Sequence, residues 1–229
     1  MRAFLLLWLA ALFAACGVAG AAGLEGVTTE EAGAGLKAVI TRGAEFGVTE
    51  LGKKDGFLGN ERVRIGLPDS LRKAENAARK LGFSKQADEV IDAMNRAAEA
   101  AVVEAKPVLL AAAKNMSFRD AAEILLGPED AATQYFKRTS TDHLAARFLP
   151  IVKLATAKVQ LAAKYNAFAG KAAKFGLIDQ RDADLDVYVT NKTVAGLFVL
   201  IAEQEKQIRA DPIGSGSLLL KKVFSAVRP

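Results

Sequence analysis

Three groups of polar side chains interrupt apolar stretches of this chain, and their types suit the recognition of anions or carboxylates. Arginine binds carboxylate and phosphate oxygens in a planar, two-point geometry, and lysine, tyrosine and asparagine add further hydrogen-bond donors. If the groups converge in a cleft, they form a ligand pocket. If they pair with one another, they form an ion-pair network that braces the protein. The candidate ligand-binding residues are Asn95, Arg96, Glu99, Tyr135, Arg138, Tyr188, Lys192 and Arg209.

Other kinds of site find little support in the sequence. A serine nucleophile needs a base and an oxyanion hole, but His143 is the only histidine and no G-x-S-x-G pattern occurs. We interpret His143 as a solvated or capping residue near a helix start. The acids at 179, 182, 184 and 186 are spaced like the start of a calcium loop, yet the required glycine and closing glutamate do not follow. We therefore expect no metal site and no cofactor, and we assign no catalytic residue.

The charge balance argues against a nucleic-acid partner. The chain has 31 basic and 26 acidic residues, a formal charge of +5. The basic residues are scattered as pairs such as Lys53 with Lys54, rather than gathered into a dense basic face with interleaved aromatic residues.

The N-terminus has the pattern of a secretory signal. Arg2 precedes an unbroken apolar run over residues 3–15, which is too short for an ordinary membrane-spanning helix. Cleavage after Ala21 would leave residues 22–27 as a short tether. Residues 13–17 (FAACG) alternatively resemble a lipobox, in which residues 1–15 are removed and Cys16, the only cysteine, is lipidated. Both alternatives place the mature protein outside the cytoplasm, and no later segment is expected to span a membrane.

Helical spacing dominates the rest of the chain. Apolar residues recur at intervals of three and four after residue 27, which predicts an all-α fold: an irregular multi-helix bundle, with one short extended segment near residues 62–67. We expect a single helical domain over residues 28–229. Thr28 and Glu31 have capping-box spacing at the start of the first helix.

Later helix boundaries are predicted from prolines and capping residues. Pro107 should kink or divide a helix that begins at Ser84. Thr141 with Asp142 should cap another helix, bent by Pro150 and continuing through Tyr165. The last long helix is expected over residues 185–209, and a terminal amphipathic helix over residues 218–227.

Several strings resemble one bacterial family of exported proteins, catalogued as domain of unknown function 4197. They are LGKKDGFLGN (51–60), GLPDSL (66–71), MNRAAEAA (94–101), DAATQYF (130–136), FLPIV (148–152), LDVYVTNKTVAGLF (185–198) and IRADP (208–212). The resemblance covers residues 35–224 and implies an all-helical exported domain. It implies no activity, so no catalytic residue is carried over.

Together these patterns predict a non-enzymatic protein of the periplasm, tethered through Cys16 to the outer membrane, that binds an envelope protein or a small ligand. The lipid anchor would be its only contact with the membrane. One alternative is a carrier of hydrophobic ligands, because alanine- and glycine-rich helices such as residues 36–51 can leave a cavity. The other is an envelope enzyme using lysine, tyrosine or carboxylate chemistry, which requires Glu99, Tyr135 and Lys192 to meet in an open cleft.

Overall fold

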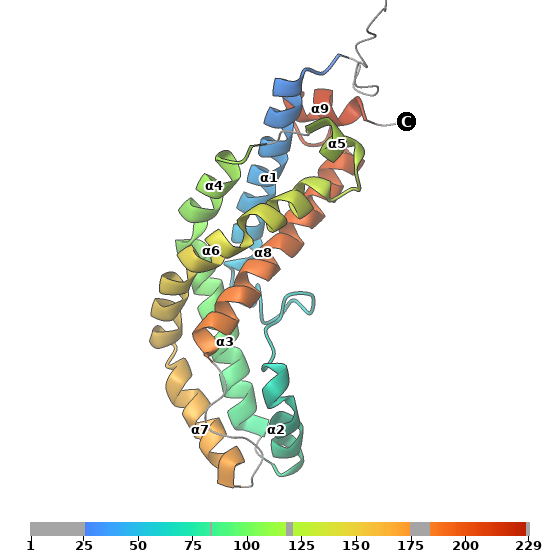
Figure 1. Ribbon diagram of the computed structural model, residues 1–229. Coiled ribbons are helices and arrows are strands. Elements are labelled where there is room, and N and C mark those ends of the chain that lie inside the picture. Colours follow the sequence, from blue (N-terminus) through green and yellow to red (C-terminus); the bar gives the residue numbers. More distant parts are fainter. Residues whose placement is uncertain (1–25, 83, 118–120, 175–183, 228–229) are drawn as a thin grey trace, which may run out of the picture.

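The computed structural model describes residues 26–82, 84–117, 121–174 and 184–227, which are helical apart from their connections. The helices are α1 (Thr29–Leu51), α2 (Asp69–Lys80), α3 (Ser84–Glu104), α4 (Lys106–Lys114), α5 (Ala121–Leu126), α6 (Ala131–Lys158), α7 (Leu161–Lys174), α8 (Leu185–Ala210) and α9 (Leu218–Ser225). They form an elongated, curved bundle with α1, α5 and α9 at one end and α2 and α7 at the other (Figure 1). The all-α prediction is confirmed. The predicted signal peptide and Cys16 lie outside the described residues.

The first helix begins where its capping residues predict. The Thr28 hydroxyl accepts a hydrogen bond from the Glu31 amide at 3.1 Å, and the Glu31 carboxylate accepts one from the Thr28 amide at 3.0 Å. Each bond satisfies an amide that has no partner within the helix. The helix ends at Leu51 with Gly52 as its C-cap, and its predicted start is confirmed.

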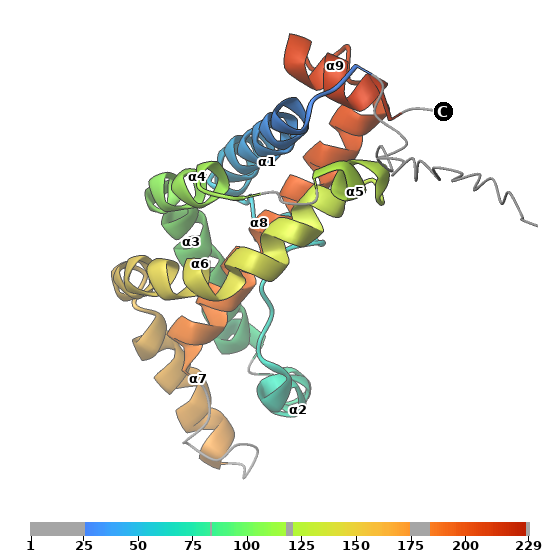
Figure 2. The same ribbon diagram turned by 45° about the horizontal axis from the view of Figure 1, so that its top comes forward.

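Helix α8 is the central element, packed against α1 on one side and α6 on the other. Figure 2 shows α6 lying across α8. At this contact the rings of Phe136 and Phe198 meet edge to face, with centroids 5.5 Å apart. Among the described residues, α8 is also the one helix long and apolar enough to cross a membrane, by length and composition alone. However, 56% of the relevant window is buried inside the protein, as is usual for a core helix.

Glycines on α1 allow α8 and α9 to approach its backbone closely. A Cβ atom at Gly43 would lie 2.9 Å from Ile201 Cγ2 and 3.1 Å from the Ile201 Cα atom. A Cβ atom at Gly35 would lie 2.9 Å from Val223 Cγ1. Side chains of the neighbouring helices therefore fill the space beside these glycines. No cavity of the kind that a hydrophobic-ligand carrier would use remains there.

This packing makes a prediction with a control on the same helix. Gly43→Ala should lower the free energy of unfolding by about 1–3 kcal/mol, because backbone atoms of α8 would have to move. Gly33→Ala should instead raise it by about 0.5–1 kcal/mol, because a Cβ atom there meets nothing within 4 Å and alanine favours helix. Urea unfolding followed by circular dichroism measures both. Equal effects of the two substitutions would contradict the close packing.

Helix α6 corrects two predicted boundaries. The chain does not start a new helix at Thr141, because the Thr141 hydroxyl donates to the Lys137 carbonyl oxygen within a continuous helix. His143 consequently lies in the middle of α6, not near a helix start. The helix ends at Lys158 rather than continuing through Tyr165, since Gln160 adopts a left-handed conformation with φ of 55°. Pro150 is accommodated inside α6, which changes direction along its length in Figure 1.

The other boundaries agree more closely with expectation. Ala105 separates α3 from α4, next to Pro107. The segment between α1 and α2 is non-helical over residues 64–68 and pairs with no strand among the described residues. Some of its backbone groups bond to side chains of α3, and others pair within the segment, as the Arg64 amide does with the Asn60 carbonyl oxygen.

Candidate functional site

Asn95 acts on the segment between α1 and α2 as a neighbouring strand would. Its side-chain oxygen accepts a hydrogen bond from the Ile65 amide at 2.9 Å, and its side-chain nitrogen donates to the Ile65 carbonyl oxygen at 2.8 Å. The same nitrogen donates to the Ile91 carbonyl oxygen at 2.7 Å. Asn95 is fully buried, so this side chain fixes the segment rather than facing a ligand.

Glu99 and Arg96 hold the preceding turn. The Glu99 carboxylate, only 7% exposed, accepts hydrogen bonds from the amides of Phe57 and Leu58 at 3.1 and 3.3 Å. Arg96 donates to Glu99 at 2.8 Å and to Asp55 at 2.7 Å. Hydrogen bonds to Glu99, and to a smaller extent to Asp55, raise the pKa of Arg96 above its ordinary value. This arginine therefore stays charged. Phe57, anchored by these contacts, packs against Gly196 in the core.

Tyr188 and Lys192 lie elsewhere, at the end of the same segment. The Tyr188 hydroxyl donates to the Gly66 carbonyl oxygen at 3.0 Å. The Lys192 ammonium lies 5.5 Å from the centre of the Tyr188 ring, within the range of a cation–π contact. Burial, and to a smaller extent the nearby Asp69 carboxylate, raises the pKa of Tyr188. Its hydroxyl therefore keeps its proton at neutral pH.

Arg209 lies in a third cluster of polar contacts, where α8 meets the ends of two other helices. Its guanidinium donates to Glu205 at 2.9 Å and to the Leu125 carbonyl oxygen at 2.8 Å, at the end of α5. The buried Glu205 carboxylate in turn accepts hydrogen bonds from the amides of Ala132 and Thr133 at 3.0 and 2.7 Å, at the start of α6. An anion at a helix N-terminus and a cation at a helix C-terminus both stabilise the helix dipoles.

Tyr135 and Arg138 lie on α6, and Tyr135 lines a groove between α4 and α6. The Tyr135 hydroxyl donates to the Ser117 carbonyl oxygen at 2.6 Å, and the Arg138 guanidinium lies 5.5 Å from the centre of the Tyr135 ring. The groove has a volume of about 560 Å³. It is lined by Pro107, Val108, Ala111, Ala112, Asn115, Met116, Ser117, Tyr135, Thr139, Ser140, His143 and Arg147.

The eight predicted ligand-binding residues therefore do not share one cavity. Tyr135 alone among them lines this groove. Along α8, Tyr188 and Arg209 belong to different clusters, separated by about 30 Å of helix. The contacts described above join these residues to other parts of the protein. Ligand binding by any of the eight therefore stays a prediction.

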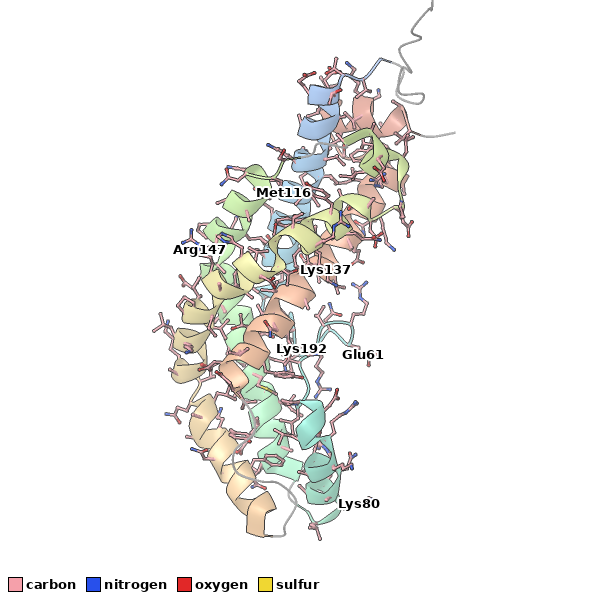
Figure 3. All side chains as sticks on the ribbon, viewed as in Figure 1. Glu61, Lys80, Met116, Lys137, Arg147 and Lys192 are labelled. Atoms are coloured by element: carbon pink, nitrogen blue, oxygen red, sulfur yellow. The ribbon has the colours of Figure 1, made fainter. Side chains whose placement is uncertain are left out.

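The groove combines an apolar floor with a polar, cationic rim. Alanine, valine, proline and methionine side chains of α4 and its C-terminal turn form the floor. Arg147 is exposed and makes no ion pair with any described residue, and no lining residue is acidic. Figure 3 shows Arg147 and Met116 on the α4 side of the molecule, apart from Lys192 and Glu61. An apolar group over the floor and an anionic group at Arg147 would complement this surface.

A second groove continues the first. Asn115, Met116 and Ser117 line both, and the second extends to the first turns of α1, with a volume of about 530 Å³. Its remaining lining residues are Thr29, Glu30, Gly33, Ala34 and Lys37. The site thus extends along the surface toward the end of the bundle where the described chain begins.

Sequence reasoning missed Arg147 and assigned His143 to a helix start. A signal was present, because Tyr135, Thr139, His143 and Arg147 recur at every fourth position and so lie along one face of α6. Placing a helix boundary at Thr141 divided this row into two unrelated parts. Among the described residues there is no group of three or more histidine, cysteine, aspartate or glutamate residues that could hold a metal ion. Asp179 and Asp182 lie outside the described residues.

These features define an all-helical protein with a long surface groove and internally paired polar clusters. The chain belongs to the family described as protein of unknown function DUF4197, whose model matches residues 26–225. No curated protein and no solved structure matches the chain.

Proposed function

We propose that this is an exported, lipid-tethered protein that binds an amphipathic anion in the groove between α4 and α6. The observation that carries the proposal is Arg147, which pairs with no acid among the described residues and lies beside an apolar floor with no acidic lining residue. The groove volume, about 560 Å³, is in the range of small-molecule sites. The expected occupant is a molecule with an acyl or similarly apolar part and a carboxylate, phosphate or sulfate group.

Export and the tether are supported by the sequence of the first 21 residues. Intact mass spectrometry of the protein from the bacterial membrane fraction tests them. A species that starts at Cys16 and carries acyl chains supports the lipid tether. A mature protein that starts at Ala22 without acyl chains contradicts it, and would leave the groove proposal standing.

The hydrophobic-ligand carrier and the envelope enzyme each require an arrangement of residues that differs from the contacts described above. A hydrophobic-ligand carrier was expected from the small residues of α1, but α8 and α9 fill the space beside Gly43 and Gly35. Enzymatic chemistry through Glu99, Tyr135 and Lys192 requires the three side chains to meet. Instead, Glu99 is enclosed by Arg96 and two backbone amides, and the other two belong to separate clusters. A non-enzymatic binding protein is therefore the function we favour.

Arg147→Glu should weaken binding of dodecanoate at least about tenfold, because it replaces the cation with an acid in the same place. Dodecanoate serves as the probe below its micelle concentration, and isothermal titration calorimetry gives the affinity. Arg64→Glu is the matched control, since Arg64 is an exposed arginine that does not line the groove. It should change the affinity less than about twofold.

Two further measurements test the two halves of the site. Ala111→Trp should also weaken dodecanoate binding, because Ala111 is an exposed floor residue and a large ring there occupies the groove. Dodecyltrimethylammonium has the same chain with a cationic head and should bind more weakly than dodecanoate. Equal affinity for both amphiphiles, or no dodecanoate binding below about 1 mM, contradicts the proposal.

A further inference from the structure

The described chain begins beside its last helix. The Glu31 carboxylate at the start of α1 accepts hydrogen bonds from the Lys222 ammonium of α9 at 2.6 and 2.7 Å. Further along α1, the Arg42 guanidinium donates to the Ser215 carbonyl oxygen in the connection between α8 and α9. The described chain, which starts at Gly26, therefore begins at the α9 end of the bundle (Figure 1).

This end carries three exposed large apolar side chains. Leu218, the first residue of α9, is 86% exposed, Ile213 in the preceding connection is 65% exposed, and Leu126 at the end of α5 is 53% exposed. Arg209 connects α5 and α9. Its guanidinium donates hydrogen bonds to backbone carbonyl oxygens of α5, and it lies 5.0 Å from the ring centre of Phe224 in α9. Single exposed apolar side chains are ordinary, but three such side chains at the end where the described chain begins suggest a surface that contacts an apolar partner.

Chain length brings this end to the membrane. Gly26 follows Cys16 by ten positions, so an acylated Cys16 could hold the start of the bundle no further than about 35 Å from the bilayer surface. Charges at this end largely compensate one another: Lys222 pairs with Glu31, and Lys206 pairs with Glu129 at 2.7 Å. Contact with lipid would therefore depend on the apolar side chains rather than on anionic headgroups.

We propose that Ile213 and Leu218 insert into the bilayer surface, so that the protein stands with its α9 end against the membrane. This proposal rests on the export and lipid tether proposed above, and it is independent of what the groove binds. The occupant is the acyl–headgroup boundary of a lipid bilayer. In this orientation the second groove, which reaches the first turns of α1, opens near the lipid surface.

A tethered tryptophan reporter tests the proposal. The chain beginning at Cys16 contains all described helices and a single cysteine, which can be coupled to phosphatidylcholine vesicles that contain a maleimide lipid. Trp8 is the only tryptophan of the full sequence and is absent from this chain. Leu218→Trp therefore reports from the α9 end alone. Leu154→Trp is the control, because Leu154 is 69% exposed near the end of α6, close to α7 at the opposite end of the bundle.

We expect the emission of Leu218→Trp to move by roughly 10 nm to shorter wavelength on coupling, as tryptophan does at a membrane interface. Brominated acyl chains should quench it, and they should leave Leu154→Trp unchanged. Ile213→Trp should behave like Leu218→Trp and provides the second variant if the first fails to fold. Identical emission of the α9-end and Leu154 reporters overturns the proposal. Dodecanoate titration of the same chains before coupling, with no bilayer present to take up the fatty acid, separates this failure from failure of the groove, which would abolish dodecanoate binding without affecting the emission shift on coupling.

Discussion

Glu205→Ala is expected to lower the free energy of unfolding by about 3–5 kcal/mol, because it removes a buried carboxylate that pairs with the nearly buried Arg209. Glu205 is fully buried, and the side chain of Arg209 is only 10% exposed. The substitution also leaves the Ala132 and Thr133 amides at the start of α6 without their acceptor. Urea unfolding followed by far-ultraviolet circular dichroism measures the effect.

Glu203→Ala is the matched control, two residues away on the same helix. Glu203 pairs with Arg62 at 2.6 Å, but its side chain is 32% exposed and that of Arg62 is 55% exposed. Ion pairs of this kind contribute about 0–1 kcal/mol. If the two substitutions lowered the free energy of unfolding equally, the buried pair would contribute no more to stability than the exposed pair, and the prediction would be wrong. Glu205→Gln should fall between them, since it keeps the shape of the side chain and removes the charge.

Asn95→Ala should destabilise the protein by about 2–4 kcal/mol and release the segment between α1 and α2. Alanine removes all three hydrogen bonds of the Asn95 side chain, and it leaves the amide and carbonyl of the buried Ile65 without partners. Because Arg62 and Arg64 lie in this segment, trypsin cleavage there under native conditions reports its release. Mass spectrometry of the fragments identifies the sites.

Asn191→Ala provides the comparison, because Asn191 is an exposed asparagine on α8. It should neither lower the unfolding free energy nor speed the cleavage, because alanine favours helix more than asparagine does. If Asn95→Ala destabilises the protein without faster cleavage after Arg62 or Arg64, the side chain supports the core but does not hold the segment. Unchanged stability would contradict the burial of its hydrogen bonds.

The elements that could be predicted from sequence are those whose signals are local. The capping box of Thr28 and Glu31 and the long apolar period of α8 act within one helix, and the structure has both helices where they were expected. The boundary predicted at Thr141 was wrong because a threonine can bond to the preceding turn as readily as it can cap a new one. Nothing in the nearby sequence distinguishes these two uses.

The site was harder to predict because its chemistry depends on residues far apart in the chain. Asn95, Arg96 and Glu99 were recognised as unusual polar residues in an apolar stretch, but their partners at Ile65, Phe57 and Asp55 are 30 or more residues away. Polar residues buried by long-range pairing and polar residues aimed at a ligand have the same sequence pattern. The row that ends at Arg147 was recognisable only once α6 was known to be continuous.

The contacts of Glu205 also set the order in which the chain can fold. The first amides of α6 find their acceptor 72 and 73 residues later, and α1 packs on α8 and α9, near the other end of the chain. Helix α1 therefore lacks its main partner, α8, until almost the whole polypeptide has been synthesised. For the export we propose, this delay is favourable, because a chain that has not yet folded can pass through a membrane as an extended polypeptide.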